Sequence, residues 1–165
     1  MSSNEPKVKD NELFNKVRKA IYHRGLWLGL IVKAAQEKGY DWEDMCRKAV
    51  GQCGCFQGNE GKEKMKNTES LLCFANCFFP EETQNMFDME VKRFDEEEIC
   101  FEFGYCPLVQ AWTDLGFEGE TLSALCDIAM EGDRGIAGQF DRFEFKLGKT
   151  IAQGHPVCEV KFLKK

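Results

Sequence analysis

The chain lacks several features that would define common classes of protein. No run of apolar residues approaches the roughly 18 that a membrane-spanning helix needs, and the opening MSSNEPKVKDNELF has no apolar core of a secretory signal. The formal net charge is −6, and no basic stripe interleaved with aromatic residues is present. We therefore expect a cytoplasmic protein that binds neither nucleic acid nor a membrane.

Three familiar catalytic signatures are also missing. The sequence contains no phosphate-binding loop, no glycine fingerprint for a dinucleotide, and no serine, histidine and aspartate in the order of a known triad. Only two histidines occur. The remaining candidates for chemistry are cysteines and carboxylates.

Apolar residues and cysteines are abundant. The chain has 165 residues, of which 43% are hydrophobic, 14 are Phe and 9 are Cys. This length and composition suit a single domain over residues 1–165 with a sizeable core. In a cytoplasmic protein the odd number of cysteines predicts reduced thiols, most of them core residues and a minority ligands or nucleophiles.

The first half of the chain has helical periodicity. After a frayed tail over residues 1–10, residues 11–80 form the helical part. It begins with a helix to Lys38, continuous or broken near Gly25, and a second helix from the cap Asp41 to about Val50. Lys64 to Phe78 predicts a third helix.

The segment between Gly51 and Gly61, GQCGCFQGNEG, is expected to be a mobile glycine-rich connection. It carries Cys53 and Cys55, and Cys73 and Cys77 follow downstream. These thiols follow no known zinc-finger spacing, so a metal site is an alternative to buried thiols beside a loop.

The second half, residues 85–165, changes to a period of two. Alternating residues predict strands near 89–94, 99–105, 143–147 and 158–162, which bracket helices at 107–115 and 121–138. The order is β-β-α-α-β-β. We predict an α+β fold, in which an antiparallel sheet carries helices on one face and has free edges that allow a homodimer.

Cys106 is the first candidate for catalysis. It follows the second predicted strand and precedes Pro107, a residue that suits the first position of a helix. A thiol at a helix N-terminus has a lowered pKa, which would make Cys106 a nucleophile or ligand. The alternative is a weak helix cap.

Cys126 and Asp133 form a second candidate pair, seven residues apart along one edge of the predicted helix 121–138. A carboxylate in an apolar stripe needs a partner, which we expect from another element. The alternatives are a structural ion pair, or a helix that ends at Gly132 so that Asp133 caps the next one. Glu131 is either solvated or part of the pocket lining.

The last strand contributes further candidates. Cys158 is expected to face the helices as a core thiol, and His155 lies in the turn before it as an exposed residue, a base or a ligand. Convergence of Cys106, Cys126 and Cys158 would line one pocket and would also suit zinc or iron, although no cofactor is required. Tyr105 and Trp112 would supply aromatic walls or core packing.

Three segments carry a resemblance to a known family: CPLVQAW, LCDIAMEGDRGIA and FEFKLGKTIAQGHPVCEVKF. They resemble the C-terminal half of the L-2-amino-thiazoline-4-carboxylic acid hydrolases, bacterial enzymes that open a ring during cysteine production. A cysteine before a helix and a glycine-x-x-x-cysteine entering the last strand are also similar to small-molecule-binding 4-vinyl-reductase domains.

The resemblance implies a hydrolase. A thiolate or an activated water would attack the C=N carbon of a small cyclic amidine-like substrate, and Asp133 or Glu131 would move protons. The alternative is a non-catalytic sensor or carrier that holds a small molecule or a metal. Replacement of Asp133 by Asn separates the two, because only a hydrolase has turnover to lose.

Overall fold

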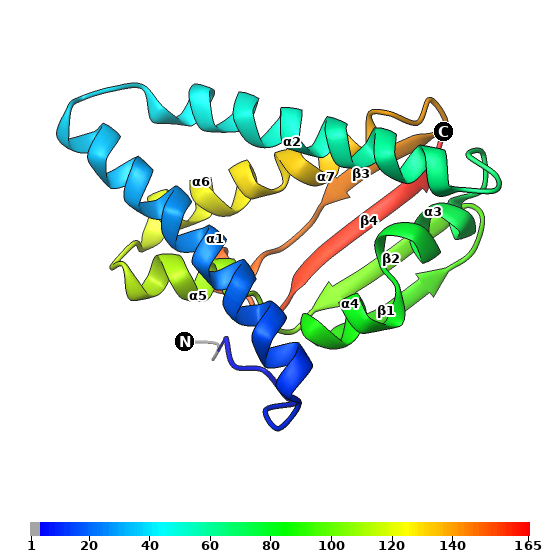
Figure 1. The fold of residues 1–165 in the computed structure, drawn as a ribbon, viewed down its shortest axis with the longest axis horizontal. Coiled ribbons are helices and arrows are strands. Elements are labelled where there is room, and N and C mark those ends of the chain that lie inside the picture. Colours follow the sequence, from blue (N-terminus) through cyan, green and yellow to red (C-terminus); the bar gives the residue numbers. More distant parts are fainter. Residues whose placement is uncertain (1–3) are drawn as a thin grey trace.

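A computed structural model describes residues 4–165 (Figure 1). Two long helices form two sides of a triangular outline, and a sheet with its covering helices closes the third side. The helices are α1 Glu12–Glu37, α2 Trp42–Lys64, α3 Leu71–Phe78, α4 Glu81–Met86, α5 Pro107–Asp114, α6 Gly119–Ala129, α7 Glu131–Ala137 and the short 3₁₀ helix η1 Ile151–Gln153. The strands are β1 Met89–Phe94, β2 Glu98–Phe103, β3 Phe143–Leu147 and β4 Cys158–Lys164.

The four strands form one antiparallel sheet in the order β1-β2-β4-β3. Alternate residues of the central strands face the helices, and Ile99, Phe101, Val160 and Phe162 are each at most 1% exposed. Several residues on the other face are charged, and Lys92 of β1 pairs across strands with Glu102 of β2 at 3.2 Å. The sequence therefore predicted the α+β class and the strand positions correctly, because a half-buried sheet imposes a period of two.

Two apolar clusters make up the core. One joins the inner face of the sheet to α3 and α7 and contains most of the buried Phe side chains. The other packs α5 and α6 against α1, α2 and η1 around Trp112, and it includes Cys126 and Cys158. The second cluster borders the candidate site.

Helix α1 is continuous, so the predicted alternative of a break near Gly25 is wrong. The Asn11 side chain accepts a hydrogen bond of 3.0 Å from the Phe14 N–H and caps the helix. A Cβ atom on Gly25 would lie 3.0 Å from the Cβ of Ala111 in α5. Gly25 allows α5 to approach closely rather than ending the helix.

Helix α2 contains the whole segment that the sequence suggested was a mobile loop. Its glycines at 51, 54, 58 and 61 recur at spacings of three and four, and the last three are buried. A Cβ on Gly54 would lie 2.8 Å from the carbonyl carbon of Gly132 in α7, and one on Gly58 would lie 2.9 Å from the Ile136 oxygen. Contact with α7 therefore offsets the low helix propensity of these glycines.

Two other helix boundaries differ from the prediction. Lys64 ends α2, and α3 begins only at Leu71, where the Ser70 hydroxyl caps it by accepting from the Cys73 N–H. The single helix expected over 121–138 is divided at Met130 into α6 and α7. Asp133 lies within α7 and caps neither helix.

Part of the expected frayed tail is anchored, although residues 1–3 lie outside the described part. The Asn4 side chain makes two hydrogen bonds of 2.8 Å to the backbone N–H and C=O of Cys106. The buried Arg18 donates to the Val8 carbonyl and pairs with Asp88 at 3.4 Å. These bonds satisfy the polar groups of a segment that has no periodic pattern of its own.

No helix within residues 4–165 is both long enough and apolar enough to cross a membrane.

Candidate functional site

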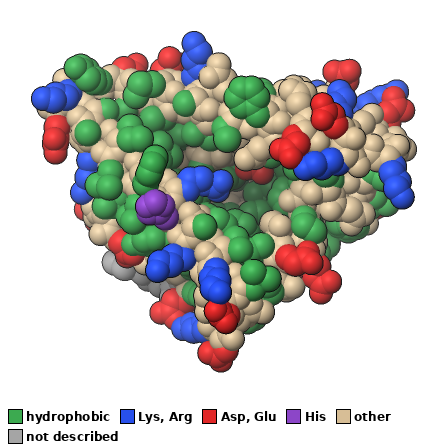
Figure 2. Space-filling view, in the orientation of Figure 1, with side chains coloured by type: hydrophobic (Ala, Val, Ile, Leu, Met, Phe, Trp, Pro, Cys, Tyr) green, Lys and Arg blue, Asp and Glu red, His purple; other side chains and the backbone are tan. Residues whose placement is uncertain are grey.

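A cavity of about 430 Å³ opens between α1, α2 and the helices that cover the sheet. Figure 2 shows this hollow near the middle of the face, bordered by hydrophobic side chains and by charged groups. Its volume is within the range of roughly 300–1,000 Å³ typical of small-molecule sites. The main apolar lining comes from Leu28, Val50, Phe78, Phe79, Leu108, Trp112 and Ile136.

Four polar side chains interrupt this apolar wall: Arg24, Cys53, Gln57 and Asp133. Arg24 of α1 and Cys53 and Gln57 of α2 are exposed, so they lie at the mouth. Asp133 of α7 is only partly exposed. A few polar groups in a largely apolar cavity are the usual means of orienting a bound molecule.

Asp133 has the most perturbed carboxyl group in the site. The surrounding protein removes it from bulk water and raises its pKa to about 6, and this effect outweighs its own backbone N–H and the charges of Arg134 and Arg24, which lower the pKa. Across residues 4–165 the carboxylate takes part in no ion pair. A carboxyl group with a pKa near 6 is suited to proton exchange near neutral pH, which makes Asp133 the main candidate for such a role in the cavity.

The three predicted cysteines do come together, beside the cavity rather than in its lining. Cys126 and Cys158 are 4% and 6% exposed, and the two thiols are close enough for each to shift the pKa of the other. The Ile151 N–H donates a hydrogen bond of 3.2 Å to the Cys158 sulfur. Cys106 lies near both, because it affects the pKa of Cys126 and Cys158 affects the pKa of Cys106. The Cys126 thiol and the Ile151 N–H lower the pKa of Cys158, whereas the neighbouring Cys158 and burial raise the pKa of Cys126.

These thiols do not form a metal centre. Within the described chain, no three His, Cys, Asp or Glu side chains are arranged so that they could hold a metal ion. Cys53 and Cys55, which lie on α2, also belong to no such group among the described residues. The geometry gives no support to the zinc or iron alternative.

The pKa of Cys106 is shifted in the direction opposite to the one expected for a thiol at a helix N-terminus. Cys106 is the N-cap of α5 and Pro107 opens the helix, as predicted. Burial, followed by the nearby Cys158, nevertheless raises the pKa of the Cys106 thiol to about 12, against the lowering effect of the Val109 and Leu108 N–H groups. Desolvation outweighs the helix terminus, and this disfavours the thiolate form of Cys106.

We therefore expect Cys106 to be unreactive in the native protein. Thiol titration with a disulfide reagent at pH 8 should show a fast phase from the exposed Cys53. The Cys53→Ser variant should lose this phase, and Cys106→Ser should keep it. A fast phase lost in Cys106→Ser would contradict the assignment.

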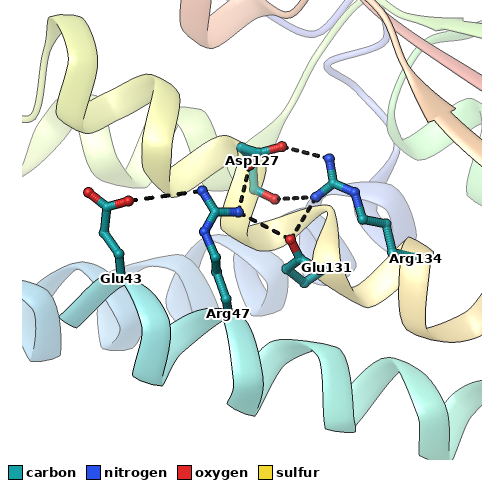
Figure 3. Close-up of polar contacts among 5 residues, drawn as sticks. All are labelled: Glu43, Arg47, Asp127, Glu131 and Arg134. Carbon is teal, nitrogen blue, oxygen red and sulfur yellow. Dashed lines mark hydrogen bonds and ion pairs between the residues drawn. The ribbon is translucent and has the colours of Figure 1, made fainter. Parts of the chain in front are cut away.

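Glu131 belongs to an ion-pair cluster outside the cavity (Figure 3). Its carboxylate is 3.1 Å from the Arg47 guanidinium and 2.9 Å from that of Arg134. Asp127 joins both arginines at 2.6 and 2.7 Å. These partners hold the Glu131 carboxylate, and of its two predicted surroundings, solvent or the pocket lining, the described cavity lining does not include Glu131.

The remaining candidates divide between the site and its surroundings. Trp112 is fully buried, lines the cavity and donates a hydrogen bond of 2.9 Å to the Gly25 carbonyl. Tyr105 lies outside the cavity lining, and the Arg18 guanidinium carbon lies 5.3 Å from the centre of the Tyr105 ring. His155 is exposed in the turn before β4.

Arg24 is the main residue that the sequence interpretation missed. Positions 17, 21, 24, 28 and 31 follow helical spacing, and all but 24 are apolar. A charged residue at an apolar position of a helix was the available signal. Gln57 had no such signal, because its segment was interpreted as a loop.

Together these features define an α+β protein with a largely apolar cavity, whose described lining includes the carboxyl group of Asp133. The chain belongs to the L-2-amino-thiazoline-4-carboxylic acid hydrolase family, whose model matches residues 18–162. This match extends the resemblance into the helical half.

Among solved structures, one similar chain is a trafficking protein particle complex subunit 3 from Naegleria fowleri, covalently bound to palmitic acid. The likeness has a TM-score of 0.61 and 15% identity, and covers 90% of this chain and 96% of that chain. At this identity it shows a shared fold only. No curated protein is a significant match to the sequence.

Proposed function

We propose that the protein is a hydrolase that opens a small C=N-containing ring inside the cavity. Membership of the family supports the reaction class. The single observation that carries the assignment is the carboxyl group of Asp133, whose pKa of about 6 suits proton transfer at neutral pH. It faces a cavity large enough for a small molecule.

In this mechanism water, rather than a thiolate, attacks the C=N carbon, because the thiolate form of Cys106 is disfavoured. Ionised Asp133 accepts one proton from the attacking water as the C–O bond forms and delivers it to the ring nitrogen of the former C=N bond. When the ring bond from this carbon to nitrogen or sulfur breaks, Asp133 passes the hydroxyl proton to the departing atom, and the carbonyl of the carbamoyl product forms. Arg24, at the mouth, would pair with an anionic group on the substrate. Trp112 would form an aromatic wall.

Turnover by the Asp133→Asn variant tests this proposal. We expect kcat for ring opening of 2-aminothiazoline-4-carboxylate to fall on the order of a hundredfold, because the amide cannot exchange a proton. Substrate binding, measured by calorimetry, should persist. Asp141→Asn, which alters an exposed carboxylate, is the matched control. Unchanged turnover in Asp133→Asn would overturn the assignment of Asp133.

A second candidate is a non-catalytic carrier of an apolar molecule. The cavity lining is mostly apolar, and the structural neighbour with the same fold is covalently bound to palmitic acid. The similarity to 4-vinyl-reductase domains predicted from the sequence belongs with this candidate. Mass spectrometry of solvent extracts from the purified protein would reveal a retained lipid. Retained lipid without ring-opening activity would favour the carrier.

A further inference from the structure

The ion-pair cluster of Figure 3 joins three helices at one point. Arg47 comes from α2, Asp127 from α6, and Glu131 and Arg134 from α7. The Asp127 carboxylate bridges Arg47 Nη1 at 2.6 Å and Arg134 Nη2 at 2.7 Å through its two oxygens, and Glu131 Oε1 accepts from both arginines. The cluster therefore spans the break between α6 and α7.

Arg134 makes the contacts that cross this break most directly. Besides its two carboxylate partners, its Nη1 donates a bond of 3.0 Å to the Asp127 backbone carbonyl, one of the last carbonyls of α6 without a partner in its own helix. Its guanidinium also lies 5.6 Å from the ring centre of Phe145 in β3. One side chain thus links α7 to α6 and to the sheet.

Other contacts of α7 come from Gly132 and Gly135, which meet the backbone of α2, and from Ala137, which is buried in the core. The helix has seven residues, too few to be stable alone. It meets α2 through Gly132 and Gly135, which allow close approach but provide no side chains to interdigitate. In a helix of about 3.6 residues per turn, the side chains of Asp133 and Arg134 point in directions that differ by roughly 100° around the helix axis. When Arg134 points to the cluster, Asp133 therefore points into the cavity.

We propose that Arg134 is a positioning residue that acts with these contacts to hold the rotation of α7 and thereby aims Asp133 into the cavity. The role in turnover rests on the proposed function, but the orientation of Asp133 does not. The cluster side chains are 25 to 38% exposed. Ion pairs of this exposure contribute little to stability, so the expected effect is on geometry.

The Arg134→Lys variant tests this inference, because lysine keeps the positive charge but cannot form the several bonds of the guanidinium. In the full chain with ¹³C-labelled aspartate, NMR titration reports the pKa of the Asp133 carboxyl group. We expect this pKa to fall by at least half a unit toward its ordinary value as the group moves toward water. The nearby positive charges, from Arg24 of α1 and from position 134, are the same in Arg134→Lys and the wild type. Turnover should fall about tenfold through kcat.

Two further variants complete the experiment. Arg142→Lys alters an exposed arginine paired with Glu69 at 3.6 Å and should leave the Asp133 pKa unchanged. Glu131→Gln weakens one Arg134 bond and should produce a smaller shift in the same direction, which covers the case of an unstable Arg134→Lys protein. An Asp133 pKa unchanged in both cluster variants would overturn the inference. The NMR result stands even if the wild-type protein shows no hydrolysis, so the two proposals fail separately.

Discussion

Replacement of Gly54 by alanine is expected to lower the free energy of unfolding by about 3 kcal/mol or more. The new Cβ would lie 2.8 Å from the carbonyl carbon and 2.9 Å from the Cα of Gly132, and closer still to the Gly132 oxygen. All of these are backbone atoms, which cannot move aside as a flexible side chain can. Relief requires separation of α2 from α7, and this would also disturb the cavity wall on which Asp133 lies.

Urea denaturation of Gly54→Ala beside Gly51→Ala measures this effect. Gly51 lies one turn earlier on α2, and the nearest atoms to an added Cβ there are 3.9 Å away, an ordinary contact. Because alanine has a higher helix propensity than glycine, Gly51→Ala should stabilise by roughly 0.5–1 kcal/mol. Equal effects of the two substitutions would show that α2 and α7 are not in close contact.

The Asp133→Asn variant is expected to be more stable than the wild type at pH 7.5, by about 2 kcal/mol. The folded pKa of about 6 lies above the ordinary value of 3.8. Between these values the folded protein binds more protons than the unfolded chain, so wild-type stability falls as pH rises from about 4 to 6. The figure is reduced from the full shift because solvent can enter the cavity.

Thermal or urea denaturation from pH 3.5 to 7.5 checks this sign. The difference between Asp133→Asn and wild type should grow through the window between pH 4 and 6 and remain level above it. Asp141→Asn should show no such growth, because Asp141 is exposed. A stability difference independent of pH would mean that Asp133 is ionised at little cost in the folded protein. A higher stability of Asp133→Asn would also be consistent with Asp133 being retained for function at the expense of stability.

Features that depend on local pattern could be predicted from the residues alone. The strands alternate because one sheet face is buried, and Phe101 and Val160 lie on that face as expected. Pro107 begins α5 because its fixed φ suits a first helical position. Cys158 is a core thiol because its strand faces the helices.

Other features depended on which element packs against which. The glycines of α2 were interpreted as a loop because glycine disfavours an isolated helix, whereas contact with Gly132 and Gly135 favours one here. Their spacing of three and four was the signal that they share one helix face. The break at Met130, which directs Cys126 and Asp133 to different surroundings, had no signal of comparable strength.

The chemistry of the site depended most on tertiary structure. Cys106 was placed correctly at a helix N-terminus, but desolvation, which no local pattern reports, raises its pKa instead of lowering it. Asp133 was recognised as a carboxylate in an apolar stripe, yet only the folded chain brings it to the same cavity as Arg24. Residue types determine which groups can carry a charge, and the dielectric surroundings that set their pKa values arise from segments far apart in the chain.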